Sequence, residues 1–106
     1  MSYTKSHKAS LYNQCIAKWG VQMQATMAME EAAEFIKALS KYQRTRAMEA
    51  RDPSLDTNEL VTTDLAEEIT DLRLMLNQIE SALNLHTLCA IAEKLKLDRL
   101  IKRLEE

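Results

Sequence analysis

The chain has 106 residues, of which 46% are hydrophobic and 28% are charged, so it suffices for one small domain. Its one glycine, Gly20, and one proline are too few for the turns of a β-sandwich or barrel and exclude a glycine-rich phosphate loop. A net charge of −2 and 5% aromatic residues argue against binding of a nucleic-acid polymer. The composition therefore predicts an all-α protein.

The cysteines and the apolar runs indicate the cellular compartment of the protein. Cys15 and Cys89 are distant in sequence and have no metal-ligand spacing, so we expect two reduced, buried side chains. No apolar stretch follows Lys5 and Lys8, and no apolar run approaches the roughly 18–20 residues of a membrane span. The sequence therefore predicts a cytoplasmic protein that does not interact with a membrane.

Four helices are expected. In chain order they cover about residues 10–19, 21–46, 59–82 and 87–104. Gly20 separates the first two, and Asn84, in the left-handed conformation, ends the third. The segment 48–58 is expected to be a loop because it contains Pro53, and Asp56 with Glu59 has the spacing of a capping box.

The third expected helix carries a row of apolar residues at alternating spacings of four and three. The row consists of Leu65, Ile69, Leu72, Leu76, Ile79 and Leu83. Such a row suits helices that pack at a small crossing angle, as in a four-helix bundle. Taken alone, it indicates a helical bundle or coiled coil without chemistry.

Two acidic pairs lie where apolar side chains are expected. At about 100° per residue, Glu31 falls inside the apolar arc of the second helix and Glu68 inside that of the third. Glu34 and Asp71 each follow three residues later, so the two carboxylates of a pair lie side by side. Burying four carboxylates together is costly, and a hard divalent cation with oxygen ligands, such as Mg²⁺, removes that cost.

The segments 30–35 and 67–72 repeat one pattern, Glu-Glu-x-x-acid-apolar. The first glutamate of each, Glu30 or Glu67, points about 100° away from the second, so we expect it at the surface or behind the ligands. A single Glu-x-x-Glu is usually solvated, but two pairs on core-facing arcs indicate a metal site. The two histidines have no Glu-x-x-His partner, which argues against a di-iron carboxylate bundle.

The pattern Glu31-x-x-Glu34 followed by Glu68-x-x-Asp71 resembles the signature of the all-alpha nucleoside triphosphate pyrophosphohydrolases, the MazG-like and dimeric dUTPase superfamily. The upstream Lys-Trp-Gly run that ends at Gly20 is similar to that of short MazG-like proteins. The resemblance covers most of the chain and implies a single MazG-like helical domain over residues 1–106.

This resemblance implies a fold, a reaction and an assembly. The fold is a four-helix bundle of the all-alpha pyrophosphohydrolase type, and the assembly is a homodimer or a homotetramer. The reaction is the Mg²⁺-dependent hydrolysis of a (d)NTP to the (d)NMP and pyrophosphate. Mn²⁺ is expected to substitute for Mg²⁺.

On this resemblance the metal ligands are Glu31, Glu34, Glu68 and Asp71. Cleavage between the α- and β-phosphates requires charge neutralisation and a positioned water rather than a protein nucleophile. One carboxylate would also accept the proton of that water, and Glu34 and Glu31 are the candidates.

Other polar residues are weaker candidates for substrate contacts. Trp19 could stack on a base, although a packed side chain is the more common role. Lys37, Lys94 and Arg99 could reach phosphates, the last two from a basic final helix across a subunit boundary, and solvated side chains are the alternative.

Two other functions fit the pattern. A non-enzymatic adaptor or oligomerisation module would use the acids to bind a basic partner and would place Glu31 and Glu68 in solvent. An all-α relative with another phosphate substrate, such as phosphoribosyl-ATP, would keep the metal site. The preferred base and sugar, and a house-cleaning or a dedicated role, stay open at this stage.

Overall fold

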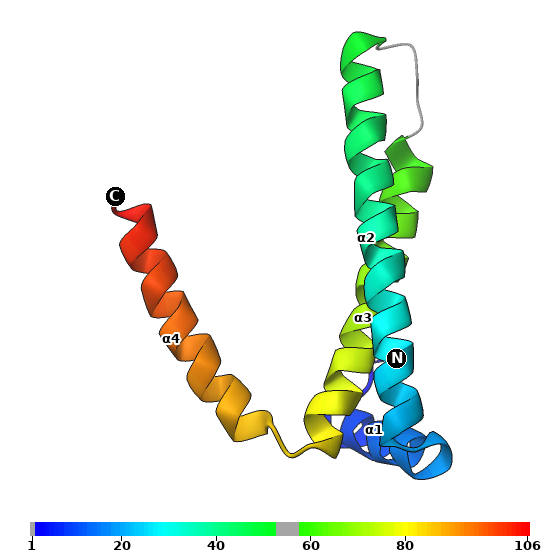
Figure 1. The fold of residues 1–106 in the computed structure, drawn as a ribbon, viewed down its shortest axis with the longest axis vertical. Helices are drawn as coiled ribbons and strands as arrows, with labels where there is room; N and C mark the ends of the chain where they lie inside the picture. Colours follow the sequence, from blue (N-terminus) through cyan, green and yellow to red (C-terminus); the bar gives the residue numbers. More distant parts are fainter. Residues whose placement is uncertain (1, 53–57) are drawn as a thin grey trace.

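The computed structural model describes residues 2–52 and 58–106, and at residues 58 and 59 it describes the backbone alone. In these ranges the chain forms four helices and no strand (Figure 1). The helices are α1 (Lys5–Trp19), α2 (Val21–Arg51), α3 (Asn58–Ala82) and α4 (His86–Leu104). The expected all-α class is confirmed.

The breaks between helices follow from single residues. Gly20 has φ 85°, which glycine adopts without strain, and its N–H donates to the Ile16 carbonyl at 2.8 Å. Asn84 has φ 54° and ends α3 as expected. Helix α1 begins earlier than expected because Thr4 caps it: the Thr4 hydroxyl accepts from the His7 N–H at 3.0 Å.

The loop was expected to begin too early. Helix α2 continues to Arg51, beyond the expected end near residue 46. Residues 47–51 are alanine, methionine, glutamate, alanine and arginine, all of which favour a helix. The proposed capping box lies outside the described part, since neither Asp56 nor the side chain of Glu59 is described.

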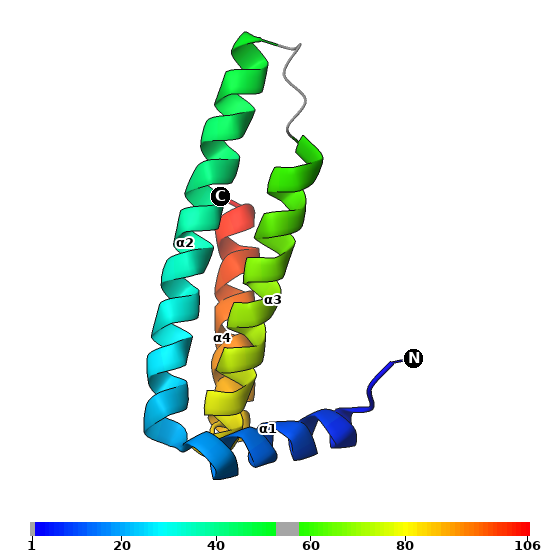
Figure 2. The same cartoon turned by 90° about the vertical axis from the view of Figure 1, so that its right-hand side faces the viewer.

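Helices α2 and α3 form a long antiparallel pair, and α1 crosses its base (Figure 2). The buried apolar side chains of the described residues are Val61 and Met75. A buried polar contact joins the pair, because Gln24 Nε2 donates to Gln78 Oε1 at 2.7 Å. On the α1 side, Asn77 Nδ2 donates to the Tyr12 hydroxyl at 3.3 Å.

Helix α4 stands apart from the other three (Figures 1 and 2). In the described residues it packs along none of them, so the expected four-helix bundle is not closed within one chain. The turn before α4 sets its direction: the Leu85 N–H donates to the Glu80 carbonyl at 2.9 Å, and His86 Nδ1 lies 2.6 Å from Glu80 Oε2. These contacts direct α4 away from the α2–α3 pair.

The apolar row expected on α3 is only partly covered. Four of its members, Leu65, Ile69, Leu72 and Ile79, are half-buried. Leu76 and Leu83 are 54% and 53% exposed, because none of the described helices covers that side of α3.

Two further expectations concern the membrane and the cysteines. Within the described ranges, every helix falls short of the length and apolarity needed to cross a membrane. Both cysteines are free, and Cys15 is half-buried. The expectation of a buried side chain is wrong for Cys89, which is exposed because it lies on the isolated α4.

Candidate metal centre

Helices α2 and α3 bring three of the predicted carboxylates together. Glu31, Glu68 and Asp71 each offer one oxygen, and these oxygens lie within 4.8 Å of one another. Oxygen ligands of one Mg²⁺, at 2.0–2.1 Å from the ion, lie at most about 4.2 Å apart. A small adjustment of side-chain rotamers would therefore let all three bind the same cation.

Helix geometry explains the juxtaposition. Glu68 and Asp71 are three residues apart on α3, so their side chains point to the same side. Glu31 approaches them from the antiparallel α2, and both Glu31 and Glu68 are half-buried between the two helices. Asp71 is exposed and leaves the group open to solvent on one side.

The charges at this point are not balanced. The pKa of Glu68 is raised above its ordinary value of 4.5, first by partial burial and then by the negative charges of Asp71, Glu31, Glu34 and Glu67. The carboxylate thus holds a proton more tightly than a solvated glutamate does. A bound cation would relieve the same repulsion.

Glu34 lies next to this group but outside it. Its side chain is exposed, and it does not join the three-oxygen group. It nevertheless lies close enough to raise the pKa of Glu68, and the two residues line the same cavity. The structure therefore places three predicted ligands together with the fourth beside them.

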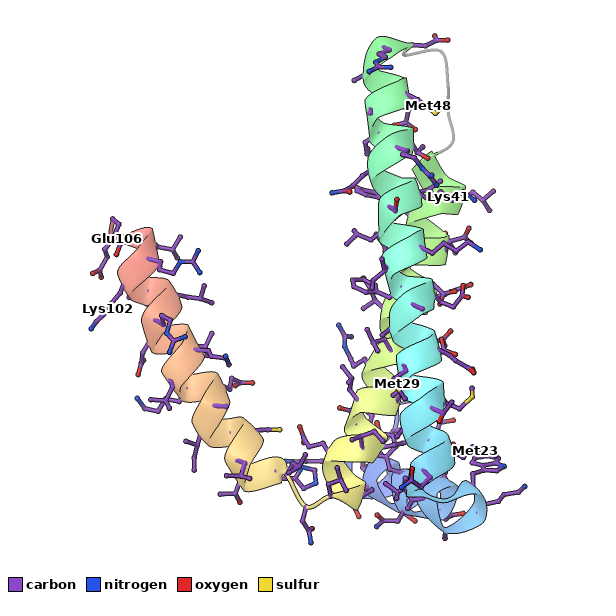
Figure 3. The ribbon with its side chains drawn as sticks, viewed as in Figure 1. Met23, Met29, Lys41, Met48, Lys102 and Glu106 are labelled. Carbon is purple, nitrogen blue, oxygen red and sulfur yellow. The ribbon has the colours of Figure 1, made fainter. Side chains whose placement is uncertain are left out.

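The cavity next to the acids has a volume of about 300 Å³. Its lining consists of Glu34, Lys37, Ala38, Lys41, Val61, Asp64 and Glu68. Lys37 and Lys41 supply positive charge one turn apart on α2, and Lys41 projects on the side of α2 away from α4 (Figure 3). Lys37 is thus the predicted substrate contact that lies beside the acids.

Asp64 is a cavity residue that the sequence analysis missed. It lines the cavity with Glu34 and Glu68 and is half-buried. The signal was present in the sequence, because Asp64 precedes Glu68 by four residues and a spacing of four places two side chains on one helix face.

The remaining predicted residues lie elsewhere. Trp19 is 48% exposed at the end of α1, and Lys18 Nζ lies 5.2 Å from its ring centroid. Lys94 and Arg99 are on α4, where Lys94 pairs with Asp98 at 3.0 Å. Within one chain, α4 does not bring these two residues to the acids.

The first glutamates of the two repeats behave as surface residues. Glu30 and Glu67 are both exposed. Glu67 lies beside Asp71 in a neighbouring shallow hollow, and its charge contributes least of the four to the raised pKa of Glu68. Neither residue belongs to the three-oxygen group.

The arrangement combines oxygen ligands suited to a hard cation with two lysines suited to phosphate groups. The half-buried Glu31 and Glu68 are not in open solvent, where an adaptor surface would place them. The chain was compared with known protein families, with curated proteins and with solved structures, and no match was found.

Proposed function

We propose that the chain is a Mg²⁺-dependent nucleoside triphosphate pyrophosphohydrolase of the all-alpha, MazG-like type. It would hydrolyse a (d)NTP to the (d)NMP and pyrophosphate. The observation that supports this most is the convergence of Glu31, Glu68 and Asp71 beside a cavity with two lysines. The protein would act on nucleotides in the cytoplasm and bind neither a nucleic-acid polymer nor a membrane.

The proposed ligands of the cation are Glu31, Glu68, Asp71 and Glu34, with Mn²⁺ as a substitute for Mg²⁺. When bound, the cation would neutralise phosphate charge and acidify the attacking water. Glu34 is the first candidate to accept the proton of that water, because it is exposed and lies beside the three-oxygen group. Glu31 is the second candidate.

Lys37 and Lys41 would bind the phosphates that leave as pyrophosphate, because both line the cavity with Glu34 and Glu68. The role of Trp19 would be to stack on the base. Lys94 and Arg99 would contact the triphosphate only of a neighbouring chain, since α4 stands apart within its own. This role requires the proposed homodimer or homotetramer.

The half-buried acids favour this function over the adaptor alternative. An adaptor that binds a basic partner would gain most from acids in full solvent contact. Glu31 and Glu68 lie instead between two helices, where an unpaired carboxylate is costly.

The test is an activity panel of canonical and modified (d)NTPs, with phosphoribosyl-ATP included, in the presence and absence of Mg²⁺. We expect at least one nucleotide to yield the monophosphate and pyrophosphate in a Mg²⁺-dependent reaction. Turnover of phosphoribosyl-ATP alone would indicate the other all-α activity. Release of orthophosphate, or no turnover of any substrate, would contradict the proposal.

A further inference from the structure

A second cavity lies at the base of the molecule, where three helices meet. Its volume is about 690 Å³, and its lining comes from α1, the end of α3 and the start of α4 (Figure 1). None of the residues proposed for nucleotide hydrolysis is among its described lining residues. The lining includes Glu80, His86 and Cys89, which carry an oxygen, a nitrogen and a sulfur ligand for a metal ion.

A sharp turn of the chain brings these three side chains together. Asn84, with φ 54°, ends α3, and the Leu85 N–H donates to the Glu80 carbonyl at 2.9 Å. This turn makes His86 the first residue of α4 and places it beside the carboxylate of Glu80. Cys89 follows His86 by three residues, so the imidazole and the thiol lie on the same side of α4.

Glu80 contacts both of the other side chains. His86 Nδ1 lies 2.6 Å from Glu80 Oε2. The Glu80 carboxylate also accepts a hydrogen bond from the Cys89 thiol, and this bond raises the pKa of the thiol. The pKa of Glu80 is lowered, first by its hydrogen bond with His86 and then by that with Cys89. One carboxylate is therefore the common neighbour of the imidazole and the thiol.

The distances are close to those that a tetrahedral ion requires. Nitrogen and oxygen ligands at about 2.0–2.2 Å from Zn²⁺ lie about 3.4 Å apart, so His86 and Glu80 would separate by less than about 1 Å. The three ligand atoms are not all within 4.8 Å of one another, as the oxygens of the candidate Mg²⁺ centre are, so binding also requires a change of rotamer. The side chains of His86 and Glu80 are 64% and 35% exposed and Cys89 is exposed, which leaves room for that change.

We propose that Glu80, His86 and Cys89 bind a single Zn²⁺ ion, with the fourth coordination position open to water from the cavity. Thiolate and imidazole ligands favour a borderline cation such as Zn²⁺ over Mg²⁺. The carboxylate and the thiolate balance the two charges of the ion, the imidazole binds in its neutral form, and the thiol proton is released to solvent. The proposal does not rest on the pyrophosphohydrolase activity, because no residue of the Mg²⁺ centre takes part in it.

The charges around the cavity permit a cation at this point. Lys5 and Lys8 of α1 line the cavity and would repel the ion. Glu80 and Glu93 line it as well, so the negative charges equal the positive ones before the ion binds. The thiolate adds a further negative charge once its proton has left. The cavity then carries an excess of negative charge, which favours the cation.

A bound ion would tie α4 to α3. Within one chain α4 packs along none of the other described helices, and the contacts of Glu80 hold its start. An ion with one ligand from α3 and two from α4 crosses the turn between them and fixes the direction of α4. The sequence does not mark this site, because Glu80, His86 and Cys89 form neither a cysteine pair nor a Glu-x-x-His pair.

The first test is a titration of the full, reduced chain with Co²⁺, which occupies zinc sites and whose absorption spectrum reports its ligands. We expect one thiolate-bound Co²⁺ per chain, with the near-ultraviolet charge-transfer band of a cobalt–thiolate bond. Zn²⁺ should displace this ion because it binds such sites more tightly, whereas millimolar Mg²⁺ should not. Absence of the thiolate band, or one thiolate-bound Co²⁺ for every two chains, would overturn the proposal.

The chain has two cysteines and two histidines, so each variant has a matched control. Cys89→Ser should abolish the thiolate band. His86→Gln and Glu80→Gln should each weaken Co²⁺ binding at least about tenfold, since the loss of a residue that only orients a ligand already costs about 10–100-fold. Cys15→Ser and His7→Gln should bind Co²⁺ as the parent does.

The outcome of these variants is decisive even if one of them disturbs the turn. Cys89 is exposed, so Cys89→Ser should keep the helices, which circular dichroism checks. A thiolate band that survives in Cys89→Ser, or that is lost in Cys15→Ser, would overturn the proposal.

Glu68→Gln separates this site from the candidate Mg²⁺ centre. Because Glu68 does not line the second cavity, Glu68→Gln should keep the thiolate band. Cys89→Ser, in turn, should keep the rise in melting temperature caused by Mg²⁺. Loss of both properties in either variant would indicate a general effect on the fold and would overturn the assignment of a separate site.

The second test measures whether the ion joins α3 to α4. Zn²⁺ should slow amide hydrogen exchange in residues 85–89, at the turn and the start of α4, and should leave the exchange near Lys41 unchanged. Cys89→Ser should show no such slowing. Exchange at residues 85–89 that does not respond to Zn²⁺ in the parent would show that no ion bridges the turn and would overturn the proposal.

Discussion

Glu68 is the residue with the most repulsive surroundings in the proposed centre. It is half-buried, and the charges of Asp71, Glu31 and Glu34 all raise its pKa. No ion pair to Glu68 is present among the described residues, so a substitution that removes its negative charge breaks no ion pair there. Glu68 therefore lowers the stability of the metal-free fold near neutral pH and is retained, in our proposal, for the cation.

We expect Glu68→Gln to separate the effect of Glu68 on the stability of the metal-free fold from its proposed role in cation binding. The change keeps the side-chain volume and removes one repelling charge, so the melting temperature without Mg²⁺ should hold or rise. The rise in melting temperature caused by millimolar Mg²⁺ should shrink, because a cation that binds only the native state stabilises it according to its affinity. Turnover should fall by orders of magnitude. Thermal melts and pyrophosphate release measure these effects.

Glu67→Gln is the matched control for that variant. Glu67 is exposed and contributes least of the four charges that act on Glu68, so its loss should change both measurements only slightly. If Glu68→Gln instead destabilised the metal-free protein by roughly 3–5 kcal/mol, a buried structural pair would be indicated in place of a metal ligand. Equal losses in the two variants would also contradict the assignment.

The raised pKa of Glu68 also predicts a pH dependence. A carboxyl whose folded pKa exceeds its unfolded value stabilises the fold in its protonated form, fully below pH 4.5, and this stabilisation is lost as the pH rises through the folded pKa. Mg²⁺ competes with that proton. The Mg²⁺-induced rise in melting temperature should therefore shrink as the pH falls toward 4.5. Melts of Glu68→Gln over the same range should show a weaker dependence, and identical curves would contradict the prediction.

At the scale of helices, one buried polar contact fixes how α2 and α3 pair. Gln24 and Gln78 are only 6% and 8% exposed, and Gln24 Nε2 donates to Gln78 Oε1 at 2.7 Å. Gln78 Nε2 also lies 3.8 Å from the Met75 sulfur. A shift of one helix along the other would leave both amides buried without partners, so the contact favours this register over its neighbours.

We expect Gln24→Leu to lower the free energy of unfolding by about 1–3 kcal/mol, because it leaves the Gln78 carbonyl oxygen buried and unpaired. The double variant Gln24→Leu, Gln78→Leu should recover part of this loss, since neither amide then remains. Chemical denaturation at fixed protein concentration measures the cycle. Gln22→Leu, at an exposed position of the same helix, is the control and should change the stability by less than about 0.5 kcal/mol. A double variant as unstable as the sum of the single ones would contradict the pairing.

The helices could be predicted from the sequence because their breaks are local. Gly20 and Asn84 each permit a backbone conformation that other residues rarely adopt, and both occupy it here. The early start of α1 was not predicted, because threonine is a common residue and a single threonine does not by itself mark the start of a helix. The position of Glu31 and Glu68 between the helices followed from angular position alone, since both helices are regular there.

Contacts between distant residues could not be predicted in the same way. The Gln24–Gln78 contact joins residues 54 positions apart, and no periodicity marks a glutamine as buried. The direction of α4 depends on the turn at Asn84 and on the bond from His86 to Glu80, which the apolar pattern of α4 does not encode. The same pattern fits a helix buried by its own chain and one buried by another.

At the scale of the whole molecule, the cavity beside the candidate centre and the exposed apolar residue Ile36 lie on different sides of α2. Lys41, which lines the cavity, projects on the side of α2 away from α4 (Figure 3), and Ile36 lies about 140° around the same helix from Lys41. The proposed oligomer and the proposed Mg²⁺ site can therefore be tested separately: Leu100→Glu, on α4, should keep a Mg²⁺-dependent rise in melting temperature, because Glu31, Glu68 and Asp71 all lie on α2 and α3.

The shortage of buried surface predicts that folding and association are coupled. A chain whose described residues include only Val61 and Met75 as buried apolar side chains gains little stability alone, so its melting temperature should rise with protein concentration. For a two-state dimer, a hundredfold increase adds about 2.7 kcal/mol, which corresponds to about 6 °C at the usual unfolding entropy per residue. Calorimetry at several concentrations measures this slope. Leu100 is 48% exposed on α4, which stands apart within its own chain, so Leu100→Glu should melt at a lower temperature that does not depend on concentration if α4 contacts another copy. Met48 is 55% exposed on the side of α2 away from α4 (Figure 3), and Met48→Glu should keep the slope of the parent. A parent melting temperature that is constant over that range would show that one chain folds without a partner.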